Sequence, residues 1–163
     1  GGRRTIAVVT GTRAEFGLLV PVMRAIAARA ELRLLTVVTG THLIAGTIRD
    51  IEAAGFAIDA RPPMQRADEP RTRAADVRAV ARGVAGLGEA FELLRPDVVL
   101  VLGDRIEAFA AATAANIGGL RVAHVHGGDR AEGIADEAIR HAITKLSHLH
   151  FPATDESRAR IVR

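Results

Sequence analysis

Short apolar runs rich in β-branched residues alternate along this chain with longer segments of helical periodicity. The runs occupy residues 5–10, 33–39, 97–102 and 121–125, with weaker ones at 148–153 and 56–60. The helical patterns cover residues 18–30, 43–54, 73–94, 107–117 and 136–146. Near-continuous apolarity suits parallel strands that are covered on both faces. The alternation predicts an α/β fold, a doubly wound, Rossmann-like parallel sheet of about six strands in one domain.

Proline and glycine mark the connections between these elements. Pro21 is expected in an early turn of the first helix or at a kink in it. Gly55 is expected to cap the second helix. Residues 61–72 contain three prolines and mixed charges, which predicts one long, mobile loop.

Composition narrows the class of protein. The 163 residues contain no Cys, Trp or Tyr, so disulfides are excluded and a reducing, cytoplasmic setting is expected. No apolar run approaches the ~20 residues that span a bilayer. The net charge is only +3 and arginines are interleaved with acids, so neither nucleic acid nor a membrane is expected as a partner. Gly1 and Gly2 are interpreted as a cloning remnant.

The loops that follow the strands combine glycine with ionisable residues. Right-handed crossovers place such loops on one edge of the sheet, which should gather Gly11, Gly40, Gly103 and Gly127. Helix N-termini at this edge favour phosphate or carboxylate. Neither the dinucleotide-binding G-x-G-x-x-G pattern nor the Walker pattern occurs, so NAD and the usual ATP cradle are not supported. An anionic ligand without a cofactor is expected.

Asp104 directly follows the fully apolar run at 97–102. An acid at the end of a buried strand is a candidate general base. The alternative is a structural role as the N-cap of the helix that starts near Ile106. The sequence leaves both interpretations open.

The helix expected at 136–146 opens with charged residues. Asp136 with Arg140, and Glu137 with His141, are spaced for i,i+4 pairs, so capping and surface pairing explain them. The functional alternative places an acid at this helix start opposite Asp104, with Arg140 steadying that acid or a phosphate.

Two H-x-H pairs, His124 with His126 and His148 with His150, resemble the ligand sets of metal hydrolases. The second pair begins a strand and should therefore lie at the opposite edge of the sheet. No metal site is expected.

Four stretches, at residues 11–19, 37–43, 97–108 and 124–151, resemble the hydrolysing UDP-N-acetylglucosamine 2-epimerases of sialic and nonulosonic acid biosynthesis. The resemblance implies the N-terminal half of a glycosyltransferase-B (GT-B) type enzyme, with a second domain supplying much of the nucleotide site. It implies C2 deprotonation and elimination of UDP from UDP-N-acetylglucosamine, then hydration to N-acetylmannosamine, without a cofactor. It also implies a homo-oligomer in the full-length form and little activity in the isolated domain.

Positions matching the family's motifs receive roles from this resemblance. The catalytic candidates are Asp104, His126, Asp136 and Glu137. The substrate-binding candidates are Arg13, Glu15, His42, Arg105, Asp129, Arg140 and His141. Where many members have Glu, this chain has His126, which can exchange a proton near neutral pH but carries no fixed negative charge. The alternatives are a related substrate of the UDP-diacetylbacillosamine type, a non-catalytic nucleotide-sugar binding or assembly domain, and a metal-dependent hydrolase.

Overall fold

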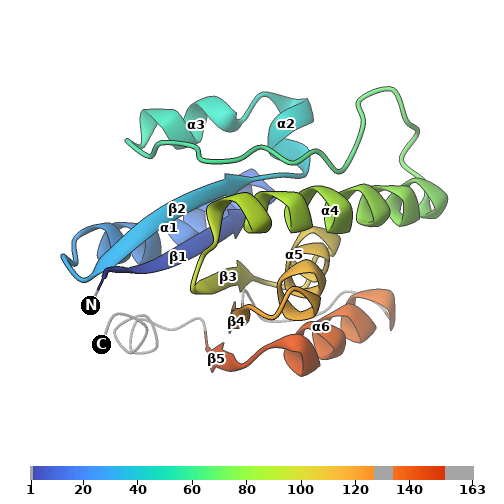
Figure 1. Cartoon of the computed structure of the whole chain (residues 1–163). Coiled ribbons are helices and arrows are strands. Elements are labelled where there is room, and N and C mark those ends of the chain that lie inside the picture. Colours follow the sequence, from blue (N-terminus) through green and yellow to red (C-terminus); the bar gives the residue numbers. More distant parts are fainter. Residues whose placement is uncertain (1, 127–133, 153–163) are drawn as a thin grey trace.

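A single parallel sheet organises the computed structural model, which describes residues 2–126 and 134–152, with side chains from residue 137 onward in the second range. Its strand order is β2-β1-β3-β4-β5 (Figure 1). The strands are β1 (Arg4–Thr10), β2 (Leu32–Val38), β3 (Val98–Leu102), β4 (Arg121–Val125) and β5 (Leu149–Phe151). The order reverses between β1 and β3, which makes this a doubly wound sheet as the sequence predicts.

Helices cover both faces of the sheet (Figure 1). They are α1 (Arg13–Ala27), α2 (Thr41–Ala45), α3 (Ile48–Ala53), α4 (Arg73–Leu94), α5 (Ile106–Ile117) and α6 (Ile134–Leu146). Helices α4, α5 and α6 pack on one face, and α1 with α3 packs on the other. Within the described ranges, no helix is both long and apolar enough to cross a membrane.

Side chains that alternate along the strands contribute to two hydrophobic cores, one on each face of the sheet. Ala7 and Val9 of β1 face α4 and α5, whereas Val8 faces α1. The same alternation runs through β3 and β4, where every residue after the first is buried. Burial of small aliphatic side chains on both faces is the main source of stability for such a sheet.

The start of α1 differs from the sequence expectation. The helix begins at Arg13 rather than Leu18, because Thr12 caps it by accepting a hydrogen bond from the backbone N–H of Glu15 at 3.2 Å. Pro21 therefore lies well inside the helix, not in an early turn. Residues 13–17, which precede the helical pattern found in the sequence, thus belong to the helix.

Two further expectations are corrected. The helix expected at 43–54 is split into α2 and α3 at Gly46, which has a φ of 73°. The strand expected at 56–60 is reduced to one bridge between Ala60 and Val37. Pro62 and Pro63 follow and offer no N–H group, so the ladder cannot continue. The described sheet thus has five strands, not six.

Candidate active site

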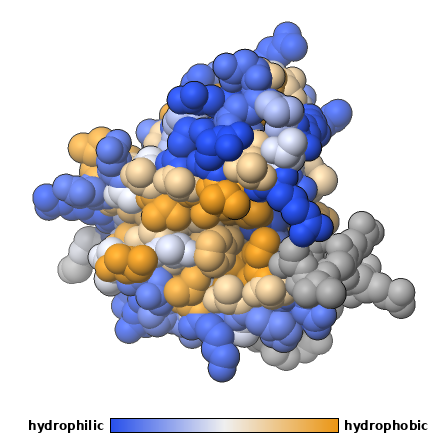
Figure 2. All heavy atoms as spheres, turned by 90° about the vertical axis from the view of Figure 1, so that its right-hand side faces the viewer, coloured by the Kyte–Doolittle hydropathy of each residue, from blue (hydrophilic) through white to orange (hydrophobic). Residues whose placement is uncertain are grey.

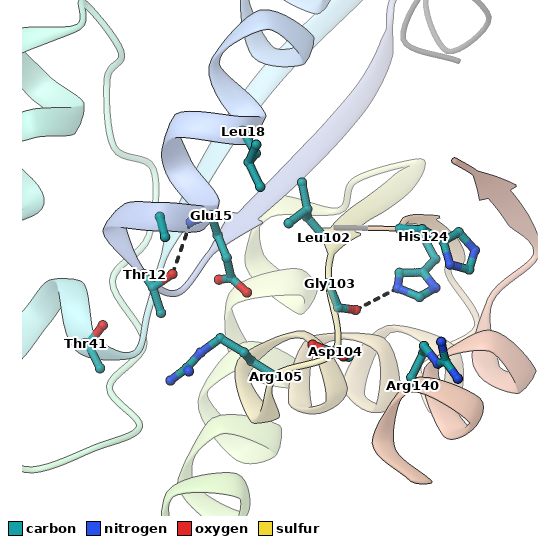
Figure 3. Close-up of a pocket in the computed structure, with 12 residues that line it drawn as sticks. Thr12, Glu15, Leu18, Thr41, Leu102, Gly103, Asp104, Arg105, His124 and Arg140 are labelled. Atoms are coloured by element: carbon teal, nitrogen blue, oxygen red, sulfur yellow. Dashed lines mark hydrogen bonds between the residues drawn. The ribbon is translucent and has the colours of Figure 1, made fainter. Parts of the chain in front are cut away.

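A cavity of about 500 Å³ opens at the carboxyl edge of the sheet, between the loops after β1 and β3. Ligands of doubly wound sheets bind where the strand order reverses, and the cavity lies at that point. Figure 3 shows its walls, which come from the start of α1, the loop after β3, β4 and α6. The lining residues are Thr12, Ala14, Glu15, Leu18, Thr41, Leu102, Gly103, Asp104, Arg105, His124, His126 and Arg140.

Glu15 brings a buried carboxyl group into this cavity. Its Oε1 accepts a hydrogen bond from the backbone N–H of Gly11 at 3.2 Å, and Oε2 is buried without a hydrogen-bond partner. Burial, followed by repulsion from Glu107, raises the pKa of Glu15 to about 8. A carboxyl group that keeps its proton at neutral pH can donate a hydrogen bond to a ligand.

Glu107, on the first turn of α5, is the second buried acid at this edge and is 1% exposed. Arg105 contacts its carboxylate at 3.1 and 3.3 Å, and Gln65 donates to it at 2.8 Å. Gly11 and Gly40, in the loops after β1 and β2, both lie against its side chain. A β-carbon would lie 2.5 Å from Cγ of Glu107 if placed on Gly11, and 2.8 Å if placed on Gly40.

Asp104 and Arg105 occupy the turn between β3 and α5, where Gly103 has a φ of 87°. Only glycine adopts this backbone conformation without strain. The N-cap position of α5 is Arg105, without a side-chain capping bond, so Asp104 is not the N-cap that the sequence allowed. Asp104 instead lines the cavity, half-buried.

His124, on β4, closes the back of the cavity. Its Nε2 donates to the carbonyl oxygen of Gly103 at 2.7 Å, while its buried Nδ1 has no hydrogen-bond partner. Burial lowers the pKa of the imidazole to about 4, so the ring is neutral at physiological pH. Figure 3 shows the bond to Gly103 joining the ends of two neighbouring strands.

His126 and Arg140 complete the far side of the cavity. The ring of His126 lies 4.6 Å from that of His124, and its backbone N–H donates to Phe151. Burial lowers the pKa of His126, and His150 and Arg140 lower it further. Arg140 reaches the cavity from α6 while one guanidinium nitrogen lies 3.5 Å from Glu137.

Four other candidate residues lie away from the cavity lining. Arg13 is exposed and pairs with Asp50 at 3.4 Å. His42 is fully buried and bonded on both ring nitrogens, to Thr10 at 3.0 Å and Thr47 at 2.8 Å.

The other two are Glu137 and His141, which form an exposed i,i+4 pair on α6 at 3.7 Å. Asp129, Gly127 and the side chain of Asp136 lie outside the described residues. The structure therefore brings together Glu15, Asp104, Arg105, His126 and Arg140.

Figure 2 looks onto the side of the molecule toward which β1, β2 and β3 point in Figure 1. Apolar residues form a band across the middle of this face, with hydrophilic residues above and below. Leu18, which lines the cavity, is 49% exposed. Exposed apolar surface next to a cavity is typical of a binding face.

Comparison with known proteins decides the family. Residues 24–163 match the model of the UDP-N-acetylglucosamine 2-epimerase family. This chain belongs to that family. It is 43% identical, over 98% of its length, to a UDP-N,N'-diacetylbacillosamine 2-epimerase (hydrolyzing) of Legionella pneumophila. It is 32% identical, over 99% of its length, to a GDP/UDP-N,N'-diacetylbacillosamine 2-epimerase (hydrolyzing) of Campylobacter jejuni. The chain spans 42% of the length of each.

The family's solved structures share the fold. The UDP-GlcNAc 2-epimerase of Neisseria meningitidis bound to UDP-GlcNAc superposes with a TM-score of 0.77 at 23% identity, over 97% of this chain and 43% of that one. The expected fold, a Rossmann-like parallel domain of the GT-B type, is confirmed.

Three residues at this site, Thr12, Glu107 and His124, were not among the sequence candidates. Thr12 and Glu15 form a T-x-x-E capping pattern that marks a helix start, and reading it would have placed α1 correctly. Glu107 could have been found as the one charged residue of helix α5, in its first turn. His124 appeared only as a member of an H-x-H pair, because no sequence signal indicates its bond to Gly103.

Proposed function

We propose that this chain is the N-terminal half of a hydrolysing nucleotide-sugar 2-epimerase. In the reaction, a base removes the C2 proton of the sugar and UDP leaves from C1, giving a glycal. Water then adds across the double bond, with the oxygen at C1 and a proton at C2. The observation that carries the proposal is the cavity at the strand-order reversal, where Asp104, His126 and two arginines line one space in a member of this epimerase family.

The cavity offers the groups that such a reaction needs. Asp104 or His126 accepts the C2 proton, because both lie at the cavity wall and a positioned carboxylate or neutral imidazole can act as a general base. Arg105 and Arg140 are suited to the departing diphosphate, since guanidinium groups bind phosphate oxygens bidentately. Protonated Glu15 supplies a hydrogen-bond donor beside them.

The sugar is an N-acetylated UDP-sugar. UDP-N-acetylglucosamine is the substrate that the sequence resemblance implies, with N-acetylmannosamine as the product for sialic acid biosynthesis. The names of the Legionella and Campylobacter relatives favour a diacetylbacillosamine-type sugar instead. Purified complete protein incubated with both sugars, with UDP release as the readout, distinguishes them.

A second domain covers the open face of the cavity in this proposal. The apolar band in Figure 2 and the exposure of Leu18 support such a cover, because an active site must exclude water to strengthen its electrostatic interactions. The complete protein is proposed to be a cytoplasmic homo-oligomer, and the absence of cysteine is compatible with that compartment.

The test uses Asp104→Asn in the complete protein. Turnover should fall by at least ~100-fold, within the range for lost acid–base catalysis. Asp68→Asn, which changes an exposed acid of the loop at 61–72, is the matched control and should retain normal turnover. Near-normal turnover of Asp104→Asn removes Asp104 from the mechanism. Nucleotide-sugar binding without any UDP release by the unmodified protein favours the alternative, a non-catalytic binding or assembly domain.

A further inference from the structure

Three histidines converge at the edge of the cavity. His124, His126 and His150 each offer a ring nitrogen, and these nitrogens lie within 4.8 Å of one another. The sequence expectation that His150 lies at the opposite edge of the sheet is wrong. Strand β5 has only three residues and pairs with the end of β4, which sets His150 directly beside His124 in register. His148, one residue before β5, accepts a bond from Val122 instead.

The hydrogen bonding of His124 is typical of a metal-binding histidine. Histidines that bind metals usually donate their second ring N–H to a carbonyl or carboxylate, which fixes the ring and its tautomer. His124 donates from Nε2 to the Gly103 carbonyl at 2.7 Å and is 1% exposed. This bond leaves Nδ1 as the unprotonated nitrogen, and Nδ1 is buried with no partner. A buried acceptor without a partner is costly, and a bound cation would satisfy it.

We propose that His124, His126 and His150 form a binding site for a first-row transition-metal ion such as Zn²⁺. Three neutral imidazoles suit Zn²⁺, Cu²⁺ and Ni²⁺ rather than Mg²⁺ or Ca²⁺, which prefer oxygen ligands. Because three protein ligands leave a fourth position of tetrahedral Zn²⁺ open, this position is available to water or an anion in the adjoining cavity. The site does not depend on the epimerase reaction proposed above, but it shares His126 with it, so Asp104 is the C2 base whenever the ion is bound.

The three ring nitrogens need to move only slightly closer together to bind one ion. Zn–N bonds of ~2.0–2.1 Å in a tetrahedron bring ligand nitrogens to roughly 3.4 Å from one another. Within the cluster, His150 is exposed and His126 is half-buried, so these two rings can rotate toward the fixed ring of His124. The positive charge of Arg140 opposes a cation at this site, and it also lowers the pKa of His126. Arg140 is itself paired with the carboxylate of Glu137.

Zn²⁺ titration of the purified 163-residue chain tests the proposal, with calorimetry as the readout. One Zn²⁺ ion per chain should bind. His150→Gln should weaken binding by at least ~100-fold, the upper end of what loss of a supporting partner costs. His141→Gln, which changes an exposed histidine on α6 outside the cluster, should bind as the unmodified chain does. Equal weakening in both variants, or no binding by the unmodified chain, overturns the proposal.

A spectroscopic test uses the unmodified chain, so its result does not depend on whether a variant folds. Co²⁺ bound at the site should give visible d–d bands without thiolate charge-transfer absorption, since the chain has no cysteine. In ¹⁵N spectra of the histidine rings, Zn²⁺ should shift Nδ1 of His124 together with one nitrogen each of His126 and His150. Shifts confined to His141 and His148 would show surface binding only and reject the site.

Discussion

Gly11 packs directly against Glu107, so that a β-carbon on Gly11 would lie 2.5 Å from Cγ and 2.6 Å from Cβ of the glutamate. The φ of Gly11 is not in the left-handed region, so the glycine is required by space rather than by backbone conformation. The loop after β1 can approach α5 this closely only because no side chain intervenes.

Gly11→Ala should lower the free energy of unfolding by about 1–3 kcal/mol, the usual cost of overpacking a filled site. Urea unfolding of the purified chain measures it. Gly17→Ala is the matched control, because a β-carbon there meets nothing within 4 Å and alanine favours the helix. Equal stability of Gly11→Ala and the unmodified chain would show that Glu107 moves aside freely.

Glu15 should make the stability of the fold depend on pH. The pKa of Glu15 in the folded chain, about 8, lies above the ordinary value of 4.5. The contribution of Glu15 to the free energy of unfolding is therefore fully present below pH 4.5 and is lost as pH rises through 8. Glu15→Gln mimics the protonated form and should be more stable than the unmodified chain at pH 9, by up to about 5 kcal/mol. Urea unfolding at pH 5 and pH 9 checks this. A difference that does not grow with pH contradicts the burial of an ionisable Glu15.

His42 should act as a core residue rather than a ligand of the substrate. His42→Phe keeps an aromatic ring, somewhat larger than imidazole, but leaves the hydroxyl groups of Thr10 and Thr47 without their ring partner. Each lost buried partner costs roughly 1–3 kcal/mol, so thermal unfolding should occur at a lower temperature. In complete protein that remains folded, KM for the nucleotide sugar should be unchanged. A KM raised several-fold without loss of stability would return His42 to the binding site.

The 163-residue chain alone should fold but release no UDP from UDP-N-acetylglucosamine. Binding energy must be focused at the reacting centre, and the cavity of this chain opens at the carboxyl edge of the sheet. Circular dichroism checks folding, and a coupled UDP assay checks turnover. UDP release above a blank without protein would show that one domain suffices.

Much of the fold follows from local sequence patterns. Helix α4 and strand β4 have the bounds that periodicity predicts, because long amphipathic and short β-branched runs have few alternatives. Helix α2 ends early because Gly46 takes a positive φ, and the segment before Pro62 pairs only once. These details depend on single backbone positions, which periodicity averages out.

The candidate site was predictable in part. Strand ends placed Asp104, Arg105 and His126 at one edge, because the handedness of parallel crossovers determines which loops meet. The sequence could not show that Glu107 turns inward beneath two glycines, or that His42 is satisfied within the core. Those outcomes depend on tertiary packing between residues far apart in the chain.

Strand β5 is the margin of the described sheet, three residues long and paired on one side only, with β4. An edge so short is weakly held by its own hydrogen bonds. A cation that bridges His150 to β4 would hold β5 in the sheet. It would add about 2.7 kcal/mol to the free energy of unfolding when the free metal concentration is a hundred times Kd. The stability of this edge of the sheet would then depend on the concentration of free metal ions as well as on the chain's own apolar contacts.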